Sequence, residues 1–225
     1  MSQSSLASIL LIGSAGHASV VADSIEREGR YRLAGCIDSF RSPGEGPIGY
    51  QVLGCEDDLE SILRQYGIEA IAVAVGDNWK RSLIAERLST GGFPQSFPAI
   101  IHPSAQIART ATVGEGSVIL AGAVINSRAS VGRWCIVNTN SSLDHDSTLR
   151  DFASLAPGAT VGGSVTIGAY TSVSLGADVI HGINIGQHTV IGAGATVVRD
   201  IPDYSLAYGN PAKVRRSRQA GDPYL

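Results

Sequence analysis

The chain has 225 residues, long enough for one large domain or two small ones, and its formal net charge is −3. Nucleic-acid binders usually carry a broad basic face, whereas the basic cluster here is confined to residues 213–218, so that class is disfavoured. The apolar run 9–12 is too short for a signal-peptide core or a membrane span, and three scattered cysteines fit a reducing compartment. We therefore expect a cytoplasmic protein with no membrane or nucleic-acid partner.

The first hundred residues alternate between strand and helix patterns. Residues 8–13 are typical of a buried strand, and a turn containing Gly16 and His17 leads into a helix. A second strand, residues 33–37, ends at Asp38, where nucleotide-binding units place a carboxylate that reads the ribose or base. Further segments are a helix at 56–66, a strand at 70–75 and a helix at 79–90. This alternation predicts a small parallel sheet flanked by helices.

The glycines of the first turn do not complete a dinucleotide signature. Gly13 and Gly16 are present, but Ala18 and Ser19 supply no third glycine. A nicotinamide-dependent enzyme is therefore disfavoured. The backbone N–H groups at the start of the following helix are nevertheless suited to hold an anion.

From Ile101 onward, an aliphatic residue recurs every six positions through Val197, in seventeen successive hexads. The fifth position of each hexad is usually small, and the second is often glycine. A period of six fits neither an α-helix nor an alternating strand, but it fits one flat side of a triangular parallel coil. Three hexads make a turn of 18 residues, so the segment 101–202 predicts five to six turns with residues 18 apart in contact.

The segments 13–17, 37–38 and 75–78, followed by the hexads, resemble the hexapeptide-repeat sugar acetyltransferases of bacillosamine, perosamine and sialic acid pathways. This resemblance implies an α/β Rossmann-like N-terminal domain over residues 1–98 and an all-β left-handed parallel β-helix over residues 99–225. The handedness rests on the resemblance, because the general rule for parallel crossovers favours the right-handed form. The resemblance also points to O-antigen (lipopolysaccharide) biosynthesis.

In this family the N-terminal domain holds the nucleotide of a nucleotide-sugar. By position, Gly16 and His17 would lie at the phosphates and Asp38 near the base or ribose. The remaining residues expected to bind the substrate are Asp77, Asn78, Arg81 and Asn138.

Acetyl transfer needs a base at the attacking atom and donors for the oxyanion. His145 stands between two carboxylates and matches the catalytic histidine of the family, with Asp146 as the residue that orients it. Adding 18 residues leads to Gly163, and adding 18 more leads to His181, so the three should stack. The resemblance places the Gly163 N–H near the acetyl thioester, and His181 is the rival base.

Acetyl-CoA is the expected co-substrate, and no metal is expected. The tail, residues 208–214, resembles the ending of hexapeptide acyltransferases, in which a lysine borders the CoA site. The residues expected to bind acetyl-CoA are Gly163, Ala193, Gly194 and Lys213. Some relatives carry a second histidine at the position of Ser154, so any role of that histidine is absent here.

A homotrimer with three shared sites is expected, because relatives are trimeric and because Leu120, Trp134 and Ile136 fall at positions that should be exposed. The leading function is N-acetylation of the 4-amino group of a nucleotide-linked sugar of the perosamine, bacillosamine or viosamine type. The alternatives are O-acetylation of sialic acid or another sugar hydroxyl, a non-catalytic nucleotide-sugar-binding protein, and a metal-dependent hexapeptide enzyme of the carbonic anhydrase type.

Overall fold

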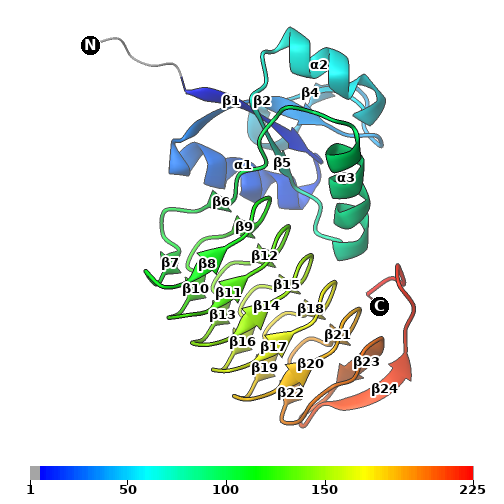
Figure 1. Cartoon of the computed structure of the whole chain (residues 1–225). Helices are drawn as coiled ribbons and strands as arrows, with labels where there is room; N and C mark the ends of the chain where they lie inside the picture. Colours follow the sequence, from blue (N-terminus) through cyan, green and yellow to red (C-terminus); the bar gives the residue numbers. More distant parts are fainter. Residues whose placement is uncertain (1–5, 225) are drawn as a thin grey trace.

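The computed structural model describes residues 6–224, which form an α/β part stacked on one end of a long β-helix (Figure 1). The α/β part is built around a five-stranded sheet of order β3-β4-β2-β1-β5. Its elements are β1 (Ala7–Ile12), α1 (Gly16–Glu28), β2 (Tyr31–Ile37), β3 (Gly44–Glu45), β4 (Gln51–Gly54), α2 (Leu59–Gln65), β5 (Ala70–Val73) and α3 (Asn78–Thr90), with 3₁₀ turns at Pro47–Gly49 and Glu56–Asp58.

The predicted alternation of strands and helices is confirmed. β1 pairs in parallel with both β2 and β5, and one face of the sheet packs on α1 while the other packs on α2 and α3. Two short strands, β3 and β4, were not predicted. They extend the sheet beyond β2, where β4 runs parallel to β2 and β3 antiparallel to β4.

The hexads form two-residue strands that pair in parallel within three sheets, so the predicted left-handed β-helix is confirmed. Two longer strands after the hexads extend the third sheet, and the last of them runs antiparallel to its neighbour. The first sheet contains β7 (Gln106–Ile107), β10 (Val124–Ile125), β13 (Ser142–Leu143), β16 (Thr160–Val161), β19 (Asp178–Val179) and β22 (Thr196–Val197). The second contains β8 (Thr112–Val113), β11 (Ser130–Val131), β14 (Thr148–Leu149), β17 (Thr166–Ile167) and β20 (Asn184–Ile185). The third contains β6 (Ile100–Ile101), β9 (Val118–Ile119), β12 (Ile136–Val137), β15 (Ser154–Leu155), β18 (Ser172–Val173), β21 (Val190–Ile191), β23 (Ser205–Tyr208) and β24 (Lys213–Ser217).

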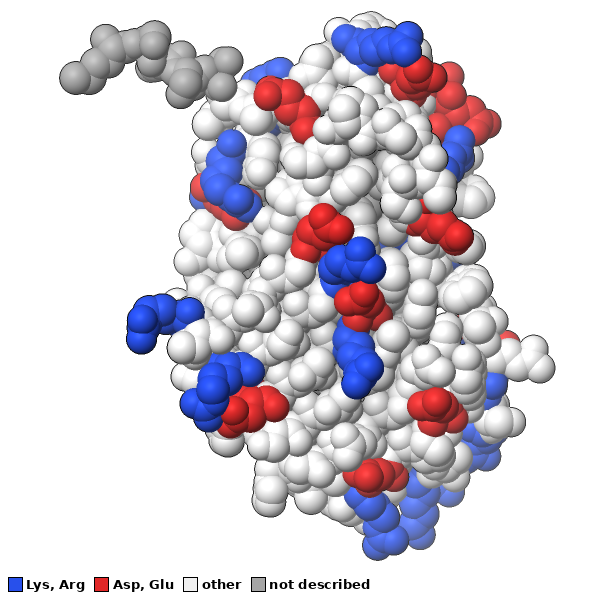
Figure 2. Space-filling model, viewed as in Figure 1, with Lys and Arg blue, Asp and Glu red and all other residues white. Residues whose placement is uncertain are grey.

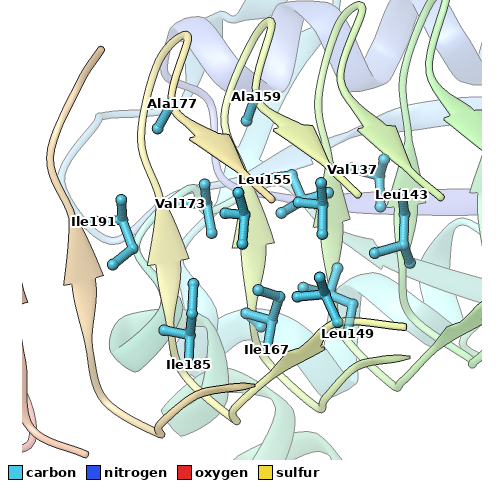
Figure 3. Close-up of a cluster of buried hydrophobic side chains, with 14 of the residues drawn as sticks. Val137, Leu143, Leu149, Leu155, Ala159, Ile167, Val173, Ala177, Ile185 and Ile191 are labelled. Atoms are coloured by element: carbon cyan, nitrogen blue, oxygen red, sulfur yellow. The ribbon is translucent and has the colours of Figure 1, made fainter. Parts of the chain in front are cut away.

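The predicted register is also confirmed. Val124 pairs with Ser142, and Ser142 pairs with Thr160, in steps of 18 residues. The aliphatic residue of each hexad belongs to the core, partly buried in the first three hexads and buried from Ile119 onward, so that Leu143, Leu149 and their equivalents form one continuous column of side chains (Figure 3). Burying these side chains stabilises the prism, at about 25 cal/mol for each Å² of apolar surface removed from water.

Polar residues at the fifth hexad position have a role beyond small size. The Ser147 hydroxyl donates to Gly162 O at 2.9 Å and accepts from the Val165 N–H at 3.0 Å. Thr171 makes the equivalent pair of bonds with Gly186 O and Thr189 N. These hydroxyls satisfy buried backbone groups at the corners, where a buried unpaired group would cost stability.

The N-terminal domain covers apolar residues that we expected on the surface. Leu120 is 0% exposed and Trp134 is 6% exposed, each in a hydrophobic cluster with residues of the α/β part. Ile136 is also buried, at 3%. The expectation that these three side chains form an exposed oligomer surface is therefore wrong, because the partner of the prism at this end is the chain's own first domain.

A buried arginine ties the two parts together. Arg81, in α3, is 0% exposed and donates to Trp134 O at 2.8 Å, to Val75 O at 2.9 Å and to Phe152 O at 3.1 Å. It also bonds Asn78 Oδ1 at 2.6 Å, while the Asn78 amide donates to Thr171 O at 3.2 Å. One side chain thus satisfies carbonyl oxygens from both parts of the chain.

After β24 the chain returns to α3, so the C-terminal tail and the N-terminal domain lie side by side (Figure 1). The N–H of Asn78 donates to the hydroxyl of Tyr224 at 2.7 Å. Among residues 6–224, no helix combines the length and the apolar character that crossing a bilayer would require.

Replacing Arg81 with methionine should destabilise the protein by about 2–4 kcal/mol, because several buried carbonyl oxygens lose their donor. Thermal and urea unfolding measure this change. The control is Arg87→Met on the same helix, where the arginine is half exposed and the expected change is within about 0.5 kcal/mol. Equal stability of both variants would contradict the role given to Arg81.

Candidate active site

His145 lies at the corner that connects the first and second sheets, directly after β13. Its Nδ1 is 2.8 Å from Asp146 Oδ2, and its side chain is 55% exposed. The preceding carboxylate, Asp144, accepts from the His145 N–H at 2.7 Å and from Asn126 Nδ2 at 2.7 Å. The Asp146 contact occupies Nδ1 and leaves Nε2 available to a substrate.

Asp146 is itself held by an arginine one coil earlier. Arg128 donates two hydrogen bonds to the two carboxylate oxygens, at 2.6 and 2.8 Å. Hydrogen bonds from Arg128 and then from His145 lower the pKa of Asp146 to about 2. The carboxylate therefore stays ionised at neutral pH and keeps His145 in one orientation.

Gly163 lies one coil after His145, as the register predicts. A Cβ at this residue would be 2.6 Å from both Cε1 and Nε2 of His145, so the ring rests on the bare glycine backbone. Gly163 has no positive φ that would by itself require glycine. No hydrogen bond from its N–H to another described residue is found.

His181 shares the face but lacks a comparable arrangement. It lies one coil beyond Gly163 and is exposed. No carboxylate of the described residues forms a hydrogen bond or ion pair with its ring, whereas His145 has one. The geometry therefore favours His145 over His181 as a base.

A cavity of about 410 Å³ lies between the third sheet and the N-terminal domain. Its wall includes His17, Asn138, Ser154 and Ala193, which brings together residues expected at the nucleotide-sugar and at CoA. His145 does not line it, because its corner belongs to a different edge of the prism.

Burial, with the nearby charge of Arg81, lowers the pKa of His17 to about 4. His17 is thus neutral near pH 7, and its buried Nε2 has no protein partner among the described residues.

A second cavity, of about 340 Å³, opens at the carboxyl ends of β1, β2 and β5. Asp38, the exposed ring of Phe40, and Lys80 line it. Asp38 accepts from the Ser14 N–H at 3.0 Å and from the Ser14 hydroxyl at 2.6 Å. Burial alone would raise the pKa of Asp38, but hydrogen bonds from Ser14 and from the Phe40 N–H outweigh it, and the pKa is lowered. This edge is where open α/β sheets bind ligands.

The other residues expected around the nucleotide do not line either of these two cavities. Asn78 and Arg81 are buried in the domain junction, so neither side chain lines the cleft as we expected. Asp77 caps α3 by accepting from the Lys80 N–H at 2.8 Å. Gly16 begins α1 and is exposed beside His17.

The residues expected at acetyl-CoA spread along the prism. Ala193 lines the 410 Å³ cavity, and Gly194 follows it at an exposed corner. Lys213 lines another cavity of about 370 Å³ with Arg199 and Asp200 at the far end of the coil. An elongated ligand is needed to contact both places.

Sequence reasoning missed Arg128 and Tyr224. Arg128 was detectable, since it precedes Asp146 by 18 residues and has the opposite charge. Tyr224, which lines the cavity beside His17, had no such signal because it reaches its partner, Asn78, across 146 residues. The ring of His188 stacks between those of Tyr170 and Tyr204, with centroid distances of 4.4 and 4.9 Å.

Neither the charges nor the titratable groups suggest another class of ligand. On the face shown in Figure 2, acidic and basic side chains are interspersed and form no broad basic area. Within residues 6–224, no group of three or more histidine, cysteine or carboxylate side chains is arranged to hold a metal ion.

Known proteins resemble this chain both in its N-terminal domain and over nearly its whole length. Residues 8–88 match the family model of the PglD N-terminal domain. Perosamine N-acetyltransferase from Caulobacter crescentus, in a variant with one histidine changed to asparagine and in complex with CoA and GDP-perosamine, is 35% identical. The alignment covers 95% of this chain and 99% of that one, with a TM-score of 0.88. The chain belongs to the hexapeptide-repeat sugar acetyltransferase family.

Two further relatives of this acetyltransferase are informative. The acetyltransferase domain of PglB from Neisseria gonorrhoeae, in complex with acetyl coenzyme A, is 34% identical over 93% of this chain and 100% of that chain, with a TM-score of 0.85. UDP-N-acetylbacillosamine N-acetyltransferase of Bacillus subtilis (strain 168) is 35% identical over 113 residues. That match spans 50% of this chain and 51% of the curated relative, about half of each.

Replacing Gly163 with alanine should leave the fold intact and displace His145, because the new methyl group would overlap the imidazole. We expect acetyl transfer to fall about tenfold to a hundredfold, the effect of misplacing a reacting group by about 1 Å. Steady-state kinetics and thermal unfolding measure the two properties separately. Ser164→Ala, at the exposed neighbouring residue, is the matched control, and full activity of Gly163→Ala would contradict this account.

Proposed function

We propose that this protein is an acetyl-CoA-dependent N-acetyltransferase that acts on the 4-amino group of a nucleotide-linked sugar. The observation that carries the proposal is the His145–Asp146 pair resting on Gly163, within a fold shared almost end to end with an enzyme solved with CoA and GDP-perosamine. Two of the relatives compared above are named N-acetyltransferases, which favours an amine over a hydroxyl acceptor.

His145 is the general base. Its Nε2 accepts a proton from the sugar amine as the amine nitrogen attacks the thioester carbonyl. The N–C bond forms, the C–S bond breaks, and the proton passes to the departing CoA sulfur. Asp146, fixed by Arg128, keeps the ring oriented and stabilises its charged form during the transfer.

The N–H of Gly163 is the proposed donor to the oxyanion of the tetrahedral intermediate. It is one coil from the base, and no described residue competes for it. Asp38 and the cavity at the strand ends are suited to the nucleoside. His17 lines the 410 Å³ cavity, where the sugar would bind, and Gly16 precedes it at the start of α1. Ala193, Gly194 and Lys213 mark a course for CoA along the prism.

The active enzyme is proposed to be a homotrimer. In one chain, His145 and the cavity beside His17 occupy different edges of the prism, so a single copy does not bring base and acceptor together. A neighbouring prism would present its His145 corner to this cavity. Such shared sites follow from cyclic symmetry, because each interface repeats around the ring.

The direct test mixes the protein with acetyl-CoA and a panel of UDP-, GDP- and dTDP-linked 4-amino sugars and follows release of free thiol. We expect turnover with one nucleotide, and a loss of about a hundredfold in His145→Ala because the base is removed. His181→Ala is the matched control and should keep its activity. Absence of turnover with every amino sugar, together with turnover of a sialic acid, would replace N-acetylation by O-acetylation.

Mixed oligomers test the shared site. Two inactive chains are co-expressed with different tags: His145→Ala, which lacks the base, and Ser174→Trp, which fills the cavity from its wall. Random assembly should restore about a quarter of the wild-type activity if base and cavity come from neighbouring chains. No restoration in purified mixed oligomers would mean that each site is built by one chain.

A further inference from the structure

The C-terminal segment 218–224 follows the last strand and is held in place by hydrogen bonds, although most of its residues are exposed. Arg218 is only 8% exposed, and its guanidinium donates to Pro223 O at 2.7 Å and to Asp222 O at 2.8 Å. Its backbone N–H donates to Tyr204 O at 2.7 Å. The Asp222 carboxylate accepts from the Gln219 N–H at 2.9 Å and closes the turn. Buried charge-assisted bonds of this kind fix a segment in one conformation.

This segment carries Tyr224 into the 410 Å³ cavity. The phenol oxygen accepts from the Asn78 N–H at 2.7 Å, and the Ser154 hydroxyl lies near the same oxygen. Burial is the largest influence that raises the pKa of Tyr224 to about 12, so the group is a neutral phenol at any working pH. On the way, Gly221 passes over Trp79, where a Cβ would be 3.1 Å from the indole nitrogen.

The position of Tyr224 along the cavity indicates which substrate it meets. The cavity runs over four coils of the third sheet, from Ile136 near the N-terminal domain to Gly192 and Ala193 at the other end. Three steps at about 4.8 Å make this path roughly 14 Å long. The hydroxyl of Tyr224 lies near Ser154, in the second of these coils, and bonds Asn78, whose amide reaches Thr171 beside the third. Ala193, which is expected at CoA, lies beyond them at the fourth coil.

We infer that Tyr224 forms a wall of the acceptor pocket and is a positioning residue for the amino sugar, with the segment 218–224 as the strap that holds it there. This inference rests on the proposed function. The ring supplies a flat apolar surface, while Asn78 and Ser154 fix its orientation through the hydroxyl. A sugar ring packs its C–H face on such a surface, leaving its amine free to meet the base.

The test compares three variants in steady-state kinetics with the amino sugar that wild type accepts. Tyr224→Ala should raise KM for the nucleotide-sugar about tenfold and leave KM for acetyl-CoA within about twofold. Tyr224→Phe keeps the ring and should restore most of the binding. Arg218→Met, which releases the strap without touching the cavity, should reproduce the effect of Tyr224→Ala.

Tyr66→Ala, at an exposed tyrosine of the N-terminal domain, is the control. A purely structural role would lower thermal stability and affect both KM values alike, and that outcome would overturn the inference. An unchanged KM for the nucleotide-sugar in Tyr224→Ala would overturn it as well. If wild type transfers acetyl to no amino sugar, the proposed function fails first, and calorimetric binding of the same nucleotide-sugars and of CoA to wild type and Tyr224→Ala then decides the role of Tyr224 separately.

Discussion

The backbone hydrogen bonds between successive coils are the interaction on which the rest of the structure depends. Between the two ends of the coil, each two-residue strand pairs with the strands one turn before and one turn after it, so the residue at a given hexad position lies over its equivalent 18 residues away. This constraint places Arg128 beside Asp146, and Gly163 beneath the ring of His145. The side chains around His145 are therefore positioned by the regular pairing of short strands, although no long helix or strand is present there.

The second constraint is the junction between the prism and the N-terminal domain. The guanidinium of Arg81 donates hydrogen bonds to carbonyl oxygens of both parts, and the side-chain amide of Asn78 donates one to the third sheet. Because these polar groups are buried, their removal would leave several partners unpaired. At the start of the same helix, the N–H of Asn78 donates to the hydroxyl of Tyr224, which lines the cavity. The domain junction, the C-terminal segment and the cavity are therefore connected through the same residues.

The proposed base and the proposed acceptor site differ in polarity and in exposure to solvent. His145 lies at an exposed corner with ionised neighbours, while the cavity beside His17 is largely apolar and contains a neutral histidine and a neutral phenol. In the proposed trimer, the base at the open corner of one copy would meet the acceptor in the drier cavity of its neighbour. The proposed trimer would therefore both complete the site and exclude water from it, which strengthens every polar contact made there.

The sequence by itself determined the β-helix, its register and the stacking of His145 on Gly163, because an 18-residue period converts spacing directly into contact. It also indicated Asp38 at the end of β2, since parallel strands bring their carboxyl ends to one edge. Only the tertiary structure decided that Arg81 and Asn78 serve the domain junction, that Leu120 and Trp134 are covered, and that Tyr224 enters the cavity. Those contacts join segments tens to more than a hundred residues apart with no shared period, and no local pattern encodes how two packed domains and a returning tail will meet.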